Sequence, residues 1–541
     1  MAKKLMSTLL AAFALLTATA DARAMDSLTY LYGGTTATYL NRMDKTFNNI
    51  NIVSPDYFEV AADGAFMYTK TPDPLLTAMM HDRGVTVTPF FSNHWSRENA
   101  RKMLARRGEV AAALAAAVTK HGLDGVDIDI QNINENDRDS FTDFIRLLRA
   151  ALPQGKTLTV CVAANPYHTN VGWQGGYDYG ALADECDHVF IMTYDESYDG
   201  GEPGPVASLW FVEESIKYAL QHVPPEKLMV GIPFYGRFWK GAIKGAAWTC
   251  SDIESLAKST NAVTWYDEAH ECARATITVP EGETAMTWGG RIISSGVYDV
   301  WYENARSYEK KMSLVRKYGL KGVGSWALGQ EADYVWGSYA AWLRGYPFDD
   351  IRDHWAQSYI VSLSESGVIK GKTDSVFDTE GHLTRAEAAA MLTRLAVGEP
   401  TTHAEDFKDT AGHWAAQYIA AARKLELVTG DETGMFRPDA DVTREEFAVM
   451  ADRYTNIEDS FDMTETQFSD VSPEGNPWSN SAIIKLCVNN VLNGYEGGAF
   501  RPSEPITRAE ASKVLVLLKE LPTRFVDGEV LPLRKGPISP R

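Results

Sequence analysis

The sequence has little positive charge, few cysteines and few long apolar runs. Its 52 basic residues are outnumbered by 72 acidic residues, which gives a formal net charge of −20 at pH 7. This balance disfavours nucleic acid as a partner, because nucleic-acid binding needs a basic patch. It favours a soluble, well-solvated exterior. The 541 residues also exceed the size of one ordinary domain, so we expect two to four domains.

A long apolar stretch occurs only near the N-terminus. Two lysines precede an apolar and small-residue stretch over residues 5–20, and an A-x-A cleavage pattern follows at residues 22–24. These features predict a signal peptide over residues 1–24, since the stretch is short for an uncleaved anchor. No other stretch is apolar enough to span a bilayer. We therefore expect an exported protein that has no membrane partner after cleavage.

The few cysteines limit the redox and metal chemistry of the chain. Five are present, and an odd number in an exported chain leaves at least one thiol unpaired or paired between molecules. Their spacing has no metal-binding pattern, so we expect neither a metal site nor a cofactor. Cys250 and Cys272 could form a disulfide, and five buried free thiols are the alternative. The remaining three are Cys161, Cys186 and Cys487.

Short apolar segments recur between amphipathic, helix-like stretches over residues 25–345. Eight strands alternating with helices predict an α/β fold, a (β/α)8 TIM barrel. An unusually long segment at about residues 240–300 predicts a small α+β insertion between the seventh and eighth strands. The eight predicted strands cover residues 28–34, 49–60, 84–92, 123–130, 157–166, 188–196, 227–236 and 320–329.

The predicted fourth strand carries an unusual row of polar residues. In the sequence HGLDGVDIDIQ (121–131), apolar residues alternate with Asp127, Asp129 and Gln131. Successive side chains of a strand point to opposite faces, so the three polar groups share one face. Carboxylates on so apolar a strand are costly to bury without a partner or a function. The row therefore indicates a functional site.

The segment DGVDIDIQ resembles the DGxDxDxE signature of glycoside hydrolase family 18, which includes chitinases and cell-wall N-acetylglucosaminidases. The match covers Asp124, Gly125, Asp127 and Asp129, and it departs at Gln131. Two further strand ends are similar to family motifs. They are the MxYD motif at Met192-Thr193-Tyr194-Asp195 and the Trp that forms the floor under the reacting sugar, Trp326.

The resemblance implies substrate-assisted hydrolysis, in which the 2-acetamido oxygen of the sugar attacks the anomeric carbon. Asp129 would orient the acetamide, Asp127 would support Asp129, and Tyr194 would bind the acetamide with help from Asp195. Asp124, Met192 and Trp326 would contribute to substrate binding. The general-acid position is occupied by Gln131, whose amide has no ionisable proton near neutral pH. Loss of a general acid typically costs about two to four powers of ten in rate.

Three explanations of Gln131 follow. It is an engineered change that traps substrate, or a native feature of a surface glycan-binding pseudoenzyme, or its role is taken by another acid. Glu135 and Glu196 are the nearest acids in sequence. The enzyme hypothesis is hydrolysis of β-1,4-linked N-acetylglucosamine glycans, peptidoglycan or chitin-like. The binding hypothesis is recognition of the same glycans without turnover.

After residue 345 the sequence becomes repetitive, with three copies over residues 346–400, 401–460 and 461–520. Each copy has a Trp at the equivalent position and a TR[AE]E segment, and the copies closely resemble S-layer homology (SLH) domains. Three such helical units can bury a core that one copy cannot. The remaining residues, 521–541, are Pro-rich and are predicted to be extended.

The TR[AE]E segments begin helices, since their Thr and Glu form a capping-box pattern. The Arg between them suits an anion near a helix N-terminus. The resemblance implies an anionic secondary cell-wall polysaccharide as the partner, with localisation at the wall of a bacterium that has a Gram-positive type envelope. Each copy also has a Trp that either faces the sugar or belongs to the core. The candidate residues are Arg385, Arg444, Arg508, Trp355, Trp414 and Trp478.

Overall fold

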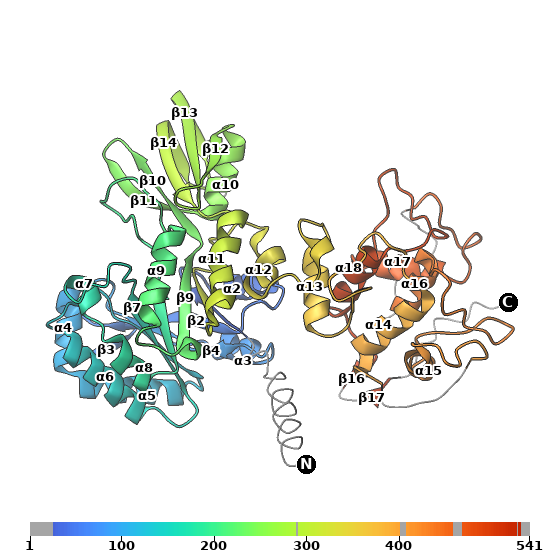
Figure 1. Ribbon diagram of the computed structural model, residues 1–541, viewed down its shortest axis with the longest axis horizontal. Coiled ribbons are helices and arrows are strands. Elements are labelled where there is room, and N and C mark those ends of the chain that lie inside the picture. The colour runs from blue at the N-terminus through green and yellow to red at the C-terminus, as the bar shows by residue number, and fades with distance from the viewer. Residues whose placement is uncertain (1–24, 288–289, 401–406, 458–467, 527–528, 532–541) are drawn as a thin grey trace, which may run out of the picture. The chain divides into compact units, whose positions relative to one another are not determined.

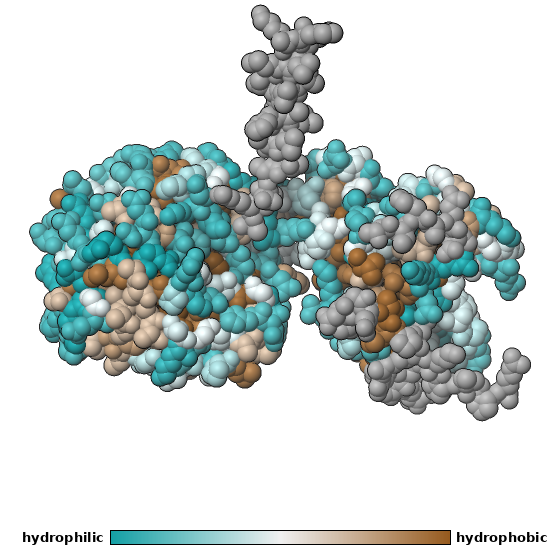
Figure 2. Space-filling model, turned by 90° about the horizontal axis from the view of Figure 1, so that it is seen from below, coloured by the Kyte–Doolittle hydropathy of each residue, from teal (hydrophilic) through white to brown (hydrophobic). Residues whose placement is uncertain are grey.

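The computed structural model describes residues 25–287, 290–400, 407–457, 468–526 and 529–531. The predicted signal peptide lies outside the described residues. The chain divides into two compact units after Gly345, and each is described by itself (Figure 1). Hydrophilic residues cover most of the face seen in Figure 2, which agrees with the acidic composition.

The first unit is a closed barrel of eight parallel strands, which confirms the predicted (β/α)8 fold. Each strand overlaps one predicted segment, and β1 closes the barrel by pairing with both β2 and β15. Short strands β3 (Phe66–Tyr68) and β4 (Thr86–Val87) extend the sheet at β2. The barrel strands are β1 (Asp26–Leu31), β2 (Ile52–Val60), β5 (Phe90–Ser92), β6 (Gly125–Asp129), β7 (Thr157–Ala163), β8 (His188–Met192), β9 (Leu228–Pro233) and β15 (Gly322–Trp326).

Helices cover the outside of the barrel, because their apolar faces pack on the outward side chains of the strands. Helix α11 shows how the sequence sets these boundaries. The Asn304 side chain caps its first turn. Gly319 ends the helix at φ 63°, a backbone conformation that glycine adopts without steric cost. The helices are α2 (Thr36–Asp44), α3 (Pro74–His81), α4 (Arg97–Ala105), α5 (Arg107–Lys120), α6 (Arg138–Ala151), α7 (Gly172–Gly175), α8 (Tyr179–Glu185), α9 (Leu209–Ala219), η1 (Pro225–Lys227), α11 (Ala305–Tyr318) and α12 (Val335–Arg344).

The predicted insertion is a five-stranded antiparallel sheet with one helix. The strand order is β11-β10-β14-β13-β12, and the sheet stands beyond one end of the barrel (Figure 1). Ile253 and Leu256 of α10 form a separate core with Ala275 and Ile277 of the sheet. Its elements are β10 (Tyr235–Lys240), β11 (Ile243–Thr249), α10 (Cys250–Ser259), β12 (Val263–Asp267), β13 (Cys272–Met286) and β14 (Ile292–Tyr302).

In the described part of the second unit, each repeat contributes two α-helices, and the repeats are arranged as a ring. The first helix of one copy packs against the second helix of the preceding copy, in the pairs α14–α15, α16–α17 and α18–α13. At the centre, backbone hydrogen bonds join Leu383 to Ile506, Ile506 to Val442 and Val442 to Leu383. The helices are α13 (Gln357–Glu365), α14 (Arg385–Val397), α15 (Ala416–Lys424), α16 (Arg444–Asp452), α17 (Asn480–Val488) and α18 (Arg508–Leu518), with η2 (Asp349–Ile351) before α13.

The segment after Leu521, which is predicted to be extended, contains two short strands among its described residues. Strands β16 (Phe525–Val526) and β17 (Glu529–Val530) form a small hairpin. Arg524 is buried beside it and donates to the carbonyls of Arg453 and Leu531 and to Glu426. A buried guanidinium with these acceptors holds the segment against the second repeat, which the Pro-rich composition did not indicate.

All five cysteines are free thiols, so Cys250 and Cys272 form no disulfide; four of the thiols are buried as the alternative predicted, and Cys487 is only partly buried. Cys250 belongs to the insertion core, whereas Cys272 packs with Trp239 and Trp301. Among the described residues, no group of three or more His, Cys, Asp or Glu side chains could hold a metal ion. No helix in the described part of the chain is long and apolar enough to cross a membrane.

Candidate functional site

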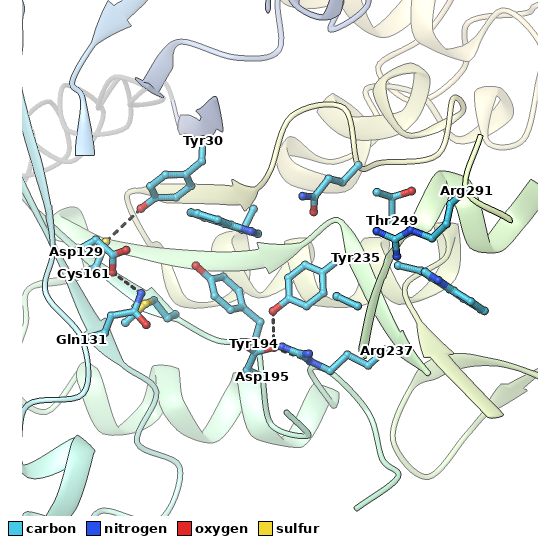
Figure 3. Close-up of a pocket in the computed structure, with 15 residues that line it drawn as sticks. Tyr30, Asp129, Gln131, Cys161, Tyr194, Asp195, Tyr235, Arg237, Thr249 and Arg291 are labelled. Atoms are coloured by element: carbon cyan, nitrogen blue, oxygen red, sulfur yellow. Dashed lines mark hydrogen bonds and ion pairs between the residues drawn. The ribbon is translucent and has the colours of Figure 1, made fainter. Parts of the chain in front are cut away.

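A cavity of about 440 Å³ lies at the C-terminal ends of the barrel strands, between the barrel and its insertion (Figure 3). This is the end of the barrel where the loops after the strands can present functional groups. Two of the polar residues of the fourth strand reach it, together with residues of the first, sixth and eighth strands. The side chains that line it are Tyr30, Asp129, Gln131, Cys161, Met192, Tyr194, Asp195, Tyr235, Arg237, Ala247, Trp248, Thr249, Arg291, Trp326 and Gln330.

Two buried carboxyl groups are stacked along β6 inside the barrel. Asp127 is fully buried and accepts from the Ser54 hydroxyl at 3.3 Å and the Cys161 thiol at 3.2 Å. Burial raises the pKa of Asp127 to about 6 and that of Asp129 to about 7. The Asp127 charge also raises the pKa of Asp129, because like charges in a low-dielectric interior repel. Both carboxyl groups are therefore protonated more readily near neutral pH than an exposed aspartate would be.

Gln131 is held rigidly beside Asp129. Its backbone N–H and carbonyl both bond to the Asn93 side chain at 2.8 Å. Its Nε2 donates to Asp129 Oδ1 at 2.6 Å (Figure 3). A protonated Glu at this position would donate in the same way, but the amide has no proton to transfer to a leaving group. Gln131 thus makes the hydrogen bond that a general acid would make here, but it cannot transfer a proton.

Three residues of the MxYD segment, Met192, Tyr194 and Asp195, also line the cavity. Tyr194 is half-buried, and desolvation raises the pKa of its hydroxyl well above the ordinary value, so it remains a hydrogen-bond donor. Asp195 Oδ1 accepts from the Tyr235 hydroxyl at 2.6 Å and from Arg237 at 2.6 and 3.0 Å. Arg237 is itself buried and donates a third bond to the Gly245 carbonyl. The insertion is therefore fixed to the barrel directly at the site.

Trp326 lies among aromatic rings at the base of the cavity. Its ring centroid is 5.0 Å from that of Tyr30 and 6.1 Å from that of Phe90. Tyr32 is 5.7 Å away on the exposed side. Met192 is nearly buried next to this group and also lines the cavity. These contacts build an apolar floor with polar groups above it, which is the composition expected of a sugar-binding site.

Asp124 is not part of the cavity, contrary to the prediction. It precedes β6 and so lies at the opposite end of that strand from Asp129. Its carboxylate accepts from the Val87 backbone N–H and contacts the His81 ring, both at 2.8 Å. Strand direction explains the error, because five residues of strand separate the two ends of the motif. Asp124 joins the loops at the base of the barrel.

Neither acid suggested as a substitute for Gln131 lines the cavity. Glu135 accepts from the Gly172 backbone N–H at 2.7 Å. Glu196 accepts from the Ser208 backbone N–H at 2.6 Å, at the start of α9, and burial raises its pKa. Both carboxylates thus accept hydrogen bonds from backbone N–H groups outside the cavity.

The three predicted arginines of the repeats join neighbouring copies. Arg508 is 1% exposed, and each of its three nitrogens donates at 2.8 Å, to Glu387 and to the carbonyls of Phe377 and Lys370. Arg385 and Arg444 make the equivalent bonds to the next copy. Their carboxylate partners are Glu446 and Glu510. Each ion pair therefore belongs to an inter-copy contact, and anion binding by these arginines stays a prediction.

Two grooves of the repeat unit lie beside these arginines. One, of about 520 Å³, is lined by Arg508, Lys370, Lys372, Arg394 and Trp414. The other, of about 370 Å³, is the equivalent groove one copy further on, with Arg385 and Trp478. The three predicted tryptophans are exposed rather than part of the core, at 54%, 57% and 55% for Trp355, Trp414 and Trp478.

Comparisons with known proteins agree with this geometry. The chain matches the model for glycosyl hydrolases family 18 over residues 15–331 and the S-layer homology domain over residues 347–389, 406–448 and 467–512. The chain therefore belongs to glycosyl hydrolase family 18 and carries three SLH repeats, which indicate attachment to a bacterial cell envelope.

Curated relatives match part of the chain. The chain is 31% identical to YdhD of Bacillus subtilis (strain 168) over 252 residues, 45% of this chain and 56% of YdhD. It is 27% identical to a cortical fragment-lytic enzyme of Bacillus anthracis over 223 residues, 40% of this chain and 49% of that enzyme. The chain thus spans about half the length of these relatives. A chitinase structure from Chromobacterium violaceum ATCC 12472 is 28% identical, with a TM-score of 0.51, covering 60% of this chain and 98% of the chitinase.

Several cavity residues were not predicted. Tyr30 continues the inward face of the first predicted strand, so alternation could have identified it. Arg237 follows the seventh strand closely in the sequence, but its ion pair with Asp195 joins residues 42 positions apart. Thr249 and Arg291 come from the insertion, whose placement over the barrel no local pattern indicates.

Proposed function

We propose that the barrel binds β-1,4-linked N-acetylglucosamine glycans at the cell envelope and does not hydrolyse them at the rate of an ordinary glycosidase. The observation that carries this proposal is the 2.6 Å hydrogen bond from Gln131 Nε2 to Asp129 Oδ1. It supports a cavity that keeps the acetamide-binding groups in place while the leaving oxygen receives no proton. Asp129, Tyr194 and Trp326 would bind the sugar, and Gln131 would donate its second N–H to the glycosidic oxygen.

The test compares release of reducing ends from chitooligosaccharides and from peptidoglycan by the native chain, Gln131→Glu and Gln131→Asn. We expect Gln131→Glu to raise the rate by about two to four powers of ten, because it restores a general acid beside a carboxyl group of raised pKa. Gln131→Asn, the matched amide control, should stay at the native rate. Substantial native turnover would contradict the proposal.

We also propose that the repeats attach the protein to an anionic secondary cell-wall polysaccharide, through the groove that Trp414 and Arg508 line. Four cationic side chains and one carboxylate, Glu387, line this groove, whereas three arginines and three carboxylates line the groove beside Arg385. An exposed ring next to cations suits a charged sugar. Co-sedimentation with purified bacterial walls tests this assignment, and a chain that stays in the supernatant would contradict it.

A further inference from the structure

The charged side chains that line the barrel cavity differ in whether they have an oppositely charged partner. Asp195 and Arg237 neutralise each other through two hydrogen bonds of 2.6 and 3.0 Å. Asp129 receives the Gln131 amide. Arg291 is different, since it lines the cavity, is exposed, and has no carboxylate partner among the described residues. One positive charge therefore faces the ligand space without an internal counter-ion.

Arg291 is presented by the insertion rather than by the barrel. Its backbone is held by two hydrogen bonds to Thr287: the Arg291 N–H donates to the Thr287 hydroxyl at 3.0 Å, and the Thr287 N–H donates to the Arg291 carbonyl at 2.9 Å. Thr287 is buried. Figure 3 shows the Arg291 side chain beside Thr249, on the side of the cavity away from Asp129 and Gln131. The guanidinium thus lies across the cavity from the acetamide-binding groups.

We propose that Arg291 selects N-acetylated glycans that carry a carboxylate substituent, in preference to neutral chitin-like chains. This inference rests on the proposed glycan-binding function and names its substrate class. A guanidinium presents several donors in a planar fork that matches a carboxylate. Neutral hydroxyls would not use its charge, and a de-N-acetylated, cationic sugar would be repelled by it. A lactyl ether on an amino sugar is a substituent of the required chemistry.

The test uses the full chain and a matched pair of ligands. One ligand is the disaccharide of N-acetylglucosamine linked β-1,4 to N-acetylmuramic acid, and the other is its methyl ester, which has the same shape without the charge. We expect the native chain to bind the free acid about three- to tenfold more tightly than the ester at low salt, with the difference shrinking as salt rises, because Arg291 is exposed to solvent. Titration calorimetry measures both affinities.

Arg291→Gln should lower the affinity for the free acid to that for the ester and leave the ester unchanged. The control is Lys258→Gln, which removes an exposed charge on α10 of the same insertion outside the cavity. Repeating the titrations in Lys370→Gln/Lys372→Gln removes the repeat groove as a second carboxylate site.

Equal affinities of the native chain for acid and ester would overturn the role of Arg291, as would an equal loss of both in Arg291→Gln. Chitotetraose separates this failure from failure of the proposed function. If chitotetraose and the ester bind but the acid binds no better, only the Arg291 inference is wrong. If none of the three ligands binds the native chain, the glycan-binding proposal is wrong and the inference falls with it.

Discussion

The barrel cavity and the repeat grooves both contain arginines, but they use them differently. Arg291 of the cavity is exposed and has no carboxylate partner among the described residues. Arg508 of the repeats is 1% exposed and has an acceptor for each of its three nitrogens. The first arrangement is suited to an incoming anion, and the second to holding two parts of the protein together. A motif position alone does not distinguish the two roles.

Removal of a buried arginine is the strongest test of this difference. Arg508→Ala leaves the Phe377 and Lys370 carbonyls without their arginine donor and removes one of the donors of Glu387, so the repeat unit should lose about 3–5 kcal/mol of unfolding free energy. Arg508→Lys should recover only part of it, since an ammonium cannot reproduce the planar fork. Differential scanning calorimetry of the full chain measures the shift of the repeat transition.

Arg291→Gln is the matched control and should change stability by no more than about 0.5 kcal/mol, because the side chain is exposed. If Arg508→Ala leaves the repeat transition in place, the buried ion pairs do not stabilise the ring. In that case the arginine side chains could leave these ion pairs and bind an anion instead.

The two units should also respond to pH in opposite directions. Burial raises the pKa of Asp129 from 3.8 to about 7, so the folded barrel binds this proton more tightly than the unfolded chain. The resulting stabilisation is complete below about pH 4 and is lost as the pH rises through 7. In the repeats, Lys372 and Arg508 help to lower the pKa of Glu387 below 4.5, so its contribution is present above that pH and is lost as the pH falls.

Calorimetry between pH 3 and pH 8 checks both signs in one chain. The barrel transition should lose on the order of a few kcal/mol between about pH 4 and pH 7, and Asp129→Asn should reduce this dependence, with Asp127, whose pKa is raised to about 6, supplying part of the remainder. The transition that Arg508→Ala shifts identifies the repeats, and it should weaken below about pH 4.5. A barrel transition that is unchanged by Asp129→Asn across this range would show that the carboxyl group titrates normally.

The smallest expected effect concerns the cationic groove. Lys370→Gln/Lys372→Gln should weaken co-sedimentation with purified walls by about tenfold at low salt, because two solvent-accessible cations are lost from the groove. The matched control is Lys408→Gln/Lys424→Gln, which removes two exposed lysines that do not line the two described grooves. Equal binding by both double variants would place the polysaccharide elsewhere.

The sequence was most informative where chemistry follows local pattern. The alternation of Val126, Ile128 and Ile130 with polar residues predicted both a strand and its functional face, and the structure brings Asp129 and Gln131 into the cavity. Capping boxes likewise predicted the starts of α14, α16 and α18. In each case the deciding interactions join residues two to four positions apart.

Contacts between residues distant in sequence could not be predicted. The Arg508–Glu387 pair joins residues 121 positions apart, so the sequence did not indicate that this arginine also joins neighbouring copies, and its contact with an anion stays a prediction. Asp124 belongs to a motif whose other members face the cavity, but strand direction places it at the other end of β6. No sequence pattern pointed to Arg291, because its position in the cavity depends on how the insertion folds over the barrel.

The ring formed by the repeats has a consequence for how the protein can vary. Solenoid arrays gain or lose copies at their ends, because each copy contacts only its neighbours. Here α18 of the last copy packs against α13 of the first, and Arg508 of the last pairs with Glu387 of the first. Such a circle has no terminal copy, so deleting or duplicating one repeat breaks two interfaces at once. The closed ring of contacts therefore fixes the number of repeats at three.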